Sequence, residues 1–400
     1  MKNIRVPYAL SFYDEKEIEA VMNVLKSGST MAGKNVDLLE QNISKAFGHK
    51  YGIMCNSGSS ALTLALSALN LPVDGEVITP ALTFATTVAT QLQLNLIPVL
   101  VDSNLETLNI DVSLIRKAIT KKTVALVIPD LMGNFSDWDE IEKIANENNL
   151  PIVHDSADTI GHKLRDKPVG TRATISTTSL YGAHIINGAG NGGMLSTSDE
   201  KIANKIRVLR SWGRDSTLFA ESENIEQRFD LDIDSIQHDR KFLFSEVGYN
   251  LEGSEISAAF ANVQFSKLDQ FKKLRRKIFD LHYEYIKKKP RVFILPKELN
   301  ESEVVWYAFP IILNENLPFS RNDLQIFLEK RNIQTRPVFA GNIIKQPAFK
   351  NKRIRVSGEL INADYIMSNA LVIGCHQGMD KDQVDWVHKS LDNFLLKYKI

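Results

Sequence analysis

Three short segments of the chain combine residue types that could bind a phosphate or move a proton. The first spans residues 56–60 and reads Asn-Ser-Gly-Ser-Ser, between an apolar run and a helical pattern. Backbone N–H groups at a helix N-terminus, together with serine hydroxyls, form a suitable site for a phosphate. A serine that merely caps the helix would leave the same pattern. Both interpretations of this segment, a phosphate site and a simple N-cap, therefore stay open.

The second segment, residues 154–158, reads His-Asp-Ser-Ala-Asp and follows an apolar, strand-like run. An acid at the carboxyl end of a parallel strand lies where ligands bind in open α/β sheets. Kept ionised, the Asp155 carboxylate could hold a ring nitrogen of a bound ligand in its protonated form. Capping of the next helix would explain this residue equally well on its own.

The third segment, residues 179–184, ends in His184 and leads into a glycine-rich loop at 188–193. That loop matches the pattern G-x-G-x-x-G, but a strand-like run follows it, whereas a dinucleotide site requires a helix there. We therefore set the dinucleotide interpretation aside. Imidazole has a reference pKa of about 6.5 and can move a proton near neutral pH, so His184 is a candidate acid–base residue. A histidine that only fills the core is the ordinary alternative.

Helix-length segments separate the strand-like runs of the first 200 residues, an order that predicts a mostly parallel sheet with helices on both faces. A first helix should begin after a cap at Asp14 and end at Gly28. Its apolar face would consist of Ile18, Val21, Met22 and Leu25. The expected strands are 51–55, 76–79, 97–101, 124–128, 152–154 and 175–180, and the expected crossover helices include 60–69 and 137–146.

The pattern changes after about residue 257, where a long helical pattern covers 258–288 and Pro290 ends it. We interpret the rest as a smaller α+β domain packed on the first, with domains at 1–265 and 266–400. Mixed strands and helices are expected over 304–312, 322–331 and 334–338, with a final helix over 381–395.

The 400-residue chain has 48 lysines and arginines against 48 aspartates and glutamates, so its formal net charge is zero. A balanced charge gives no electrostatic reason to bind nucleic acid or an anionic membrane surface. Cys55 and Cys375 lie far apart without metal-ligand spacing, which favours a reducing compartment and argues against a disulfide scaffold. The sequence has no histidine pair four residues apart and no long apolar run, so we expect a cytoplasmic protein with no metal site and no membrane span.

The order of these features resembles the sugar aminotransferase family of fold-type-I pyridoxal-phosphate enzymes, over nearly the whole chain. The resemblance is closest to the nucleotide-sugar 3-dehydratase branch of that family. It implies an α/β fold with a three-layer, mostly parallel sheet domain and a smaller α+β C-terminal domain. Beside the three segments above, the stretches that carry it are 80–84 (PALTF), 131–134 (LMGN), 211–215 (SWGRD), 248–251 (GYNL) and 335–342 (TRPVFAGN).

The resemblance implies roles for residues at matching positions, beginning with the phosphate of pyridoxal or pyridoxamine phosphate. Asn250 would reach the cofactor phosphate of the neighbouring subunit, which implies a homodimer with shared active sites. The phosphate ligands within one chain would be Gly58, Ser59, Ser60 and Ser179.

Other matching positions would contact the cofactor ring or the substrate. Phe84 would stack on the pyridine ring, Asp155 would pair with the ring nitrogen, and Asp158 would lie near the phenolic oxygen. Weaker candidates for contacts with the sugar or the nucleotide are Arg214, Arg336 and His376.

Position 184 separates the two main activities that the resemblance allows. In the aminotransferases of the family a lysine here bonds to the cofactor, whereas this chain has His184 and no lysine between Lys167 and Lys201. Imidazole forms no stable imine with an aldehyde, so the cofactor would be held by noncovalent contacts. The resemblance then implies removal of the C3 hydroxyl from a nucleotide-linked 4-keto-6-deoxyhexose, with L-glutamate or a similar amino donor and His184 as base and then acid.

Two departures from the branch keep alternatives open. The loop after His184 is one residue longer, and Asn191 stands where a glutamate is usual. The cysteines that bind a [2Fe–2S] cluster in one member of the branch have no counterpart here, so cluster-dependent electron transfer is not expected. The alternatives are an aminotransferase with an unconventional residue, a catalytically silent sugar-nucleotide-binding paralogue, and a dehydratase that uses external iron–sulfur components.

Overall fold

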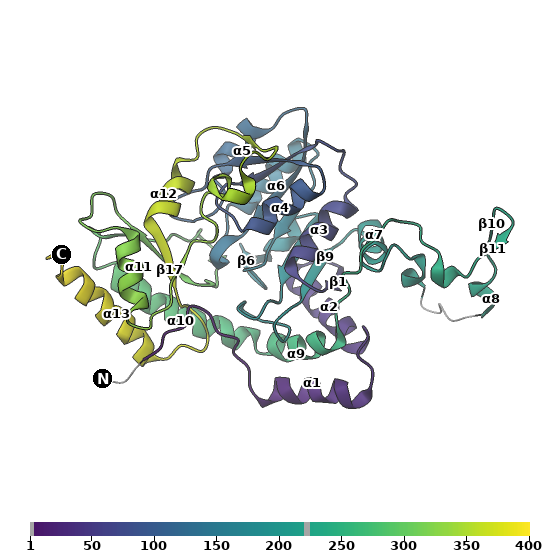
Figure 1. Cartoon of the computed structure of the whole chain (residues 1–400), viewed down its shortest axis with the longest axis horizontal. Helices are drawn as coiled ribbons and strands as arrows, with labels where there is room; N and C mark the ends of the chain where they lie inside the picture. The colour runs from purple at the N-terminus through teal and green to yellow at the C-terminus, as the bar shows by residue number, and fades with distance from the viewer. Residues whose placement is uncertain (1–3, 220–224) are drawn as a thin grey trace.

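The computed structural model describes residues 4–219 and 225–400, and its centre is an eight-stranded sheet with helices on both faces (Figure 1). The strand order is β1-β9-β8-β5-β4-β2-β3-β16. All neighbouring pairs are parallel except those that β9 makes with β1 and β8. The expected mostly parallel α/β sheet is therefore confirmed.

All six strands expected in the first 200 residues are present, within two residues at each end. Two further strands complete the sheet: β9 (Gly193–Thr197), and β16 (Arg355–Val356) at the edge beside β3. The six are β1 (Tyr51–Cys55), β2 (Glu76–Pro80), β3 (Ile97–Val101), β4 (Thr123–Pro129), β5 (Ile152–Asp155) and β8 (Ile175–Ser179).

Alternating side chains of the central strands divide between two apolar layers. Val127 of β4 packs in the layer with α3 and α7, whereas Leu126 and Ile128 pack in the layer with α5 and α6. This alternation buries both faces of the sheet. The helices of this part are α1 (Glu15–Ser27), α2 (Lys34–Phe47), α3 (Gly58–Ala68), α4 (Ala85–Gln93), α5 (Val112–Ala118), α6 (Trp138–Glu147) and α7 (Glu200–Arg210).

A four-stranded antiparallel sheet forms the centre of the C-terminal part, in the order β12-β14-β17-β15. Its strands are β12 (Phe293–Ile294), β14 (Phe309–Leu313), β15 (Arg336–Pro337) and β17 (Ala370–Ile373), and the helices around it are α10 (Leu268–Ile286), α11 (Arg321–Glu329), α12 (Ile361–Asn369) and α13 (Lys381–Leu396). The chain also returns to the large sheet here, because Arg355 of β16 makes an ion pair with Glu76 of β2 at 2.9 Å.

Two expected elements differ from the structure. The helical pattern over 258–288 is broken at Lys267 into α9 (Glu255–Ser266) and α10. The Lys267 ammonium lies 2.7 Å from the buried Glu17 carboxylate, a tertiary contact that apolar periodicity does not encode. Of the element expected at 304–312, only Phe309 onward pairs in the sheet, because the preceding residues pack on the turn at Met132, whose carbonyl accepts from the Tyr307 N–H at 2.8 Å.

Helix α1 begins and ends as expected, with Asp14 in a capping box and Gly28 as a left-handed C-cap. Its expected apolar face is nevertheless exposed: Ile18, Met22 and Leu25 each retain more than 40% of their accessible surface. The side that packs inward carries Glu17 and Val24 instead.

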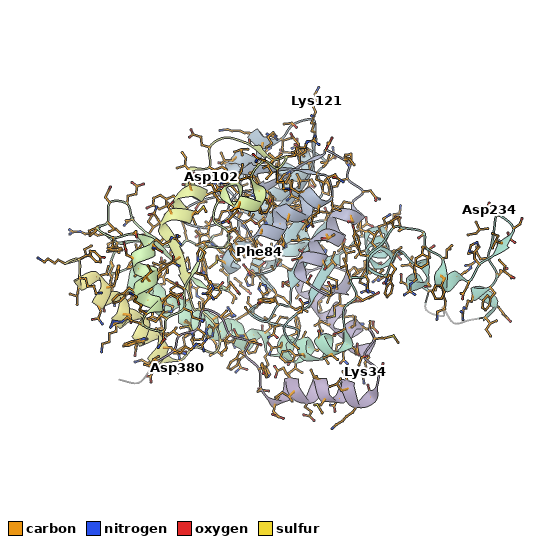
Figure 2. The ribbon with its side chains drawn as sticks, in the orientation of Figure 1. Lys34, Phe84, Asp102, Lys121, Asp234 and Asp380 are labelled. Carbon is orange, nitrogen blue, oxygen red and sulfur yellow. The ribbon has the colours of Figure 1, made fainter. Side chains whose placement is uncertain are left out.

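An arm formed by residues 215–219 and 225–249 extends away from the two sheets (Figure 1), and Figure 2 labels Asp234 near its tip. It contains α8 (Ile225–Arg228) and the hairpin of β10 (Asp232–Ile233) and β11 (Ile236–Gln237). A third small sheet joins β6 (Lys163–Leu164), β7 (Lys167–Pro168) and β13 (Ser302–Glu303). Among the described residues, no helix is both long and apolar enough to cross a membrane.

Candidate active site

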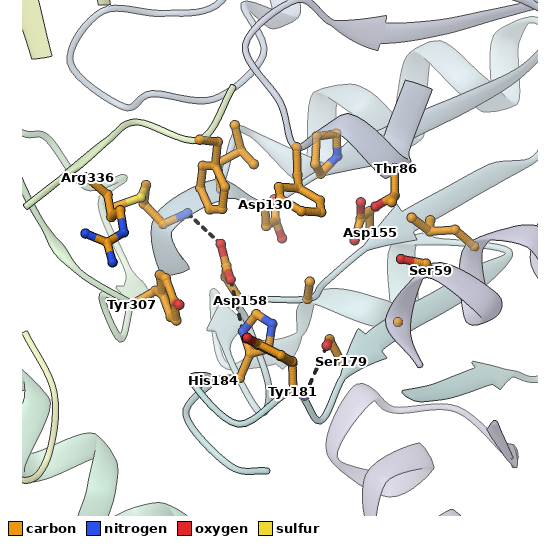
Figure 3. A pocket seen from close by; sticks show the side chains of 18 of the residues that line it. Ser59, Thr86, Asp130, Asp155, Asp158, Ser179, Tyr181, His184, Tyr307 and Arg336 are labelled. Carbon is orange, nitrogen blue, oxygen red and sulfur yellow. Dashed lines mark hydrogen bonds and ion pairs between the residues drawn. The ribbon is translucent and has the colours of Figure 1, made fainter. Parts of the chain in front are cut away.

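A cavity of about 340 Å³ opens at the carboxyl ends of β4 and β5, beside the N-terminus of α3 (Figure 3). This is the edge at which open α/β sheets bind ligands. Eight of the twelve residues singled out from the sequence line the cavity: Gly58, Ser59, Phe84, Asp155, Asp158, Ser179, His184 and Arg336.

At one end of the cavity, which we call the glycine–serine end, Gly58, Ser59 and Ser179 come together. Ser57 caps α3 by accepting from the Ser60 N–H at 3.1 Å. A Cβ on Gly58 would lie 2.7 Å from the Ser179 Cβ, so only glycine allows the helix to start this close to the end of β8. The Ser60 hydroxyl points elsewhere and donates to Asn56 Oδ1 at 2.6 Å. The end therefore offers backbone N–H groups and hydroxyls rather than cationic side chains.

Asp155 lies in the middle of the cavity, at the end of β5. Its Oδ2 accepts from the Thr87 hydroxyl at 2.7 Å. The pKa of Asp155 is raised to about 6: burial is the largest cause, the Thr87 hydroxyl lowers the pKa, and the nearby Asp158 raises it. A cation placed against this carboxylate would offset its desolvation. Phe84, half-exposed at the start of α4, adds an apolar wall, with its ring 6.2 Å from that of Phe339.

At the other end, which we call the histidine end, His184 lies against Asp158 (Figure 3). His184 Nδ1 is 3.3 Å from Asp158 Oδ1, although neither atom makes a hydrogen bond of good geometry to the described residues. The other Asp158 oxygen accepts from the Met132 N–H at 3.1 Å. Met132 has a φ of 63°, a left-handed conformation that is uncommon for this residue type.

Three tyrosines surround the histidine end. The ring centroids of Tyr307 and Tyr181 lie 5.4 Å and 6.2 Å from that of His184, and the Tyr8 ring lies 5.9 Å from that of Tyr307. Burial raises the pKa of Tyr307 to about 12, so its phenol is neutral at physiological pH. Sequence reasoning missed Tyr8 and Tyr307, because neither lies in a motif that points to the site.

Four of the residues singled out from the sequence do not line the cavity. One is Ser60, described above. Asn250 is exposed at the base of the arm, and the Arg214 guanidinium lies 4.3 Å from the Trp212 ring centroid. His376 is buried, with Nε2 at 3.1 Å from the Pro7 carbonyl, and burial lowers its pKa to about 4. Their proposed ligand contacts stay predictions.

Comparisons with known proteins point to one family of enzymes. The model of the DegT/DnrJ/EryC1/StrS aminotransferase family matches residues 12–392. The chain is 35% identical to a dTDP-4-dehydro-2,6-dideoxy-D-glucose 3-dehydratase of Saccharopolyspora spinosa, over 96% of this chain and 85% of that one. It is 32% identical to the GDP-4-keto-6-deoxy-D-mannose 3-dehydratase of Yersinia pseudotuberculosis, over 98% and 99%. A crystal structure of GDP-4-keto-6-deoxymannose-3-dehydratase with a trapped PLP-glutamate geminal diamine superposes with a TM-score of 0.88 at 29% identity, covering 96% of this chain and 100% of that one.

Proposed function

Because the chain belongs to the DegT/DnrJ/EryC1/StrS aminotransferase family, we propose that it removes the C3 hydroxyl of a nucleotide-linked 4-keto-6-deoxyhexose. It is an enzyme with the fold of the pyridoxal-phosphate-dependent transferases, and pyridoxal or pyridoxamine phosphate is its cofactor. The observation that carries the proposal is His184 facing Asp158, at the position where the aminotransferases of this family are expected to have their lysine.

The cavity residues fit this cofactor. The close approach at Gly58 leaves α3 N–H groups and the Ser59 and Ser179 hydroxyls for its phosphate. Asp155 is a buried carboxylate whose hydrogen bonds come from neutral groups, the Thr87 hydroxyl and the Ala157 N–H, so a protonated ring nitrogen would supply the missing positive charge. When bound, the protonated ring supplies an electron sink.

His184 would do the proton transfers. Since Nδ1 of His184 faces the Asp158 carboxylate, we assign the proton transfers to Nε2. This atom would take the proton from the C4′ carbon of the cofactor and later give a proton to the departing C3 hydroxyl of the sugar. Asp158 would orient the ring and stabilise its cationic form, and the Met132 N–H would orient Asp158 in turn. No lysine lines the cavity among the described residues, in keeping with a cofactor that is held without a covalent bond.

The substrate is proposed at the level of its class. Relatives are named for GDP- and dTDP-linked 4-keto sugars, so the nucleotide is a variable of the experiment rather than part of the proposal. L-glutamate is the proposed amino donor, because a similar protein was trapped with a glutamate-containing cofactor species.

We also propose that the enzyme works as a homodimer with shared active sites. The exposed apolar face of α1 and the exposed apolar residues of the arm, such as Ile236 and Val247, are surfaces suited to a second copy. A partner's Asn250 would then reach the glycine–serine end, where the described residues of one chain provide no cationic side chain. Light scattering of the holoenzyme tests the dimer. The free, buried thiols of Cys55 and Cys375 are in keeping with a cytoplasmic enzyme.

Mass spectrometry of the products tests the activity. The enzyme would be incubated with pyridoxal phosphate, glutamate and a panel of GDP-, CDP- and dTDP-linked 4-keto-6-deoxy sugars. We expect a sugar product that has lost its C3 oxygen, together with free ammonia and 2-oxoglutarate. Nitrogen retained in the sugar would instead identify an aminotransferase, and binding without turnover across the panel would identify a silent paralogue.

A further inference from the structure

Arg275 of α10 is a buried cation without an anionic partner. Its accessible surface is 1%, and it takes part in no ion pair among the described residues. Burial lowers the pKa of its guanidinium. A charge buried in this way is costly unless its hydrogen bonds are of good geometry, so the contacts it makes are informative.

All the acceptors around Arg275 are neutral, and they belong to segments beside the cavity. Nε donates to Gln377 Oε1 at 2.7 Å. Nη1 donates to the Tyr307 carbonyl at 3.0 Å and to the Cys375 carbonyl at 3.1 Å. One guanidinium thus joins α10 to the segment that carries Tyr307 and to the chain just after β17.

Gln377 continues this contact to the histidine end of the cavity. It is buried, and its Nε2 donates to the Ile185 carbonyl at 3.2 Å. Ile185 follows His184 directly in the turn after β8. Arg275 therefore contacts both flanks of His184: the Tyr307 backbone directly, and the Ile185 carbonyl through Gln377.

The contacts of the His184 ring do not fix the position of its backbone. Its ring is 3.3 Å from Asp158, without a hydrogen bond of good geometry, and its backbone N–H donates to Tyr181 within the same turn at 3.0 Å. A lysine bonded to the cofactor would be positioned by that bond, whereas an unattached imidazole depends on its own backbone. Among the described residues, the Gln377 amide is the side chain from outside the turn that donates to the backbone next to His184, at the Ile185 carbonyl.

We propose that Arg275 and Gln377 are positioning residues for His184: Arg275 orients the Gln377 amide, and this amide holds the Ile185 carbonyl so that the imidazole meets both Asp158 and the substrate. The inference rests on the proposed role of His184 as the proton-transfer residue. A displacement of about 1 Å at a reacting group can cost on the order of 10²-fold in rate, so a contact this close to the imidazole has a large expected effect.

The variant Gln377→Glu separates positioning from folding. A glutamate keeps an acceptor for Arg275 Nε but has no N–H to donate to Ile185. We expect the thermal midpoint to stay within a few degrees of the wild type and the KM for the nucleotide sugar to stay within about twofold. We expect kcat to fall about 10- to 100-fold. In the apoenzyme, the NMR resonance of the His184 Cε1–H, assigned by its loss in His184→Asn, should shift or broaden.

Gln383→Glu is the matched control, because the Gln383 amide also donates to a backbone carbonyl, that of Arg5, away from the cavity. It should leave kcat and the His184 resonance unchanged. If Gln377→Glu does not fold, Gln377→Met, which fills the same buried space without polar atoms, replaces it with the same expected readouts.

Wild-type kcat together with an unshifted His184 resonance in the Gln377 variant would overturn the inference. Failure of the proposed function would look different. In that case His184→Asn itself would keep full turnover, whereas the apoenzyme resonance would still report whether Gln377 holds the imidazole in place.

Discussion

The two ends of the cavity are built in opposite ways. The glycine–serine end comes mainly from Gly58 and Ser59 at the start of α3, joined by Ser179, and it presents neutral donors. The histidine end brings together Tyr8, Asp158, His184 and Tyr307, which lie in separate parts of the chain. The glycine–serine end is suited to binding an anion, and the histidine end is suited to proton transfer.

This difference matches the chemistry proposed for each end. A phosphate that only has to be held needs fixed N–H groups, and a helix N-terminus supplies them with little reorganisation. A residue that transfers protons needs a neighbour that stabilises its charged form. The Asp158 carboxylate, 3.3 Å from His184, can do this for the imidazolium. Substitutions at the histidine end should therefore lower turnover, whereas substitutions at the glycine–serine end should lower cofactor affinity or disturb packing.

The largest effect is expected at the histidine end, in His184→Asn. Loss of a general acid–base group typically costs about 10²- to 10⁴-fold in rate, so kcat should fall by that factor. The spectrum and affinity of the bound cofactor should change little, because the phosphate and ring contacts lie elsewhere. Steady-state kinetics and cofactor titration measure the two quantities.

His388→Asn provides the matched control, since His388 lies away from the cavity and packs on Tyr285 with ring centroids 4.2 Å apart. It should turn over at the wild-type rate. Full turnover of His184→Asn, or covalent attachment of the cofactor to a lysine after borohydride treatment, would contradict the contrast between the two ends.

The middle of the cavity should make the apoenzyme sensitive to pH. The pKa of Asp155 is about 6 in the folded protein and about 3.8 for an unperturbed aspartate, so between these pH values the folded state binds a proton that the unfolded state has lost. The Asp155 contribution to the free energy of unfolding should therefore fall as pH rises from about 4 to about 6, and then level off. About two pKa units correspond to roughly 3 kcal/mol.

Chemical denaturation of the apoenzyme between pH 4 and pH 7 measures this contribution, with Asp155→Asn as the comparison. The free energy of unfolding of Asp155→Asn should lack the Asp155 contribution to the pH dependence between about 4 and about 6. Saturating cofactor should reduce this pH dependence in the wild type. An identical slope in the two proteins would contradict the assignment.

Asp155→Asn should also weaken cofactor binding. A hydrogen bond to a charged group contributes about 1.5–3 kcal/mol, so the cofactor Kd should rise about 10- to 100-fold. Fluorescence titration measures this change. Asp111→Asn, which alters a solvent-exposed helix cap, should leave the Kd unchanged. Equal affinity in wild type and Asp155→Asn would mean that the ring nitrogen lies elsewhere.

The smallest of these effects is expected at the glycine–serine end, in Gly58→Ala. The added Cβ would lie 2.7 Å from the Ser179 Cβ, and overpacking of this kind typically costs about 1–3 kcal/mol. The same change at Gly182, where the nearest atom is 3.5 Å away, should cost less than about 0.5 kcal/mol. Urea denaturation of both variants distinguishes them, and equal stability would contradict the close packing of α3 on β8.

Much of the eight-stranded sheet and its first helices could be predicted from the sequence. The six strands, the capped first helix and the turn at residues 56–60 depend on hydrophobic periodicity and on capping residues a few positions away. The division of residues 258–288 at Lys267 could not be predicted, because an ion pair with Glu17, far along the chain, accompanies it. The exposure of the apolar face of α1 could not be predicted either, because amphipathic periodicity does not say which surface will cover that face.

The sequence by itself determined the chemical groups of the site: a glycine–serine helix start, an aspartate at a strand end, and a histidine with no lysine nearby. Only the tertiary structure decided which distant residues meet them, because the Tyr307 ring and the Gln377 amide approach the turn of His184 from separate segments, with Arg275 bonded to both residues. Local patterns encode hydrogen bonds between near neighbours, whereas contacts across a hundred or more residues arise when buried surfaces and buried polar groups find partners in the folded core.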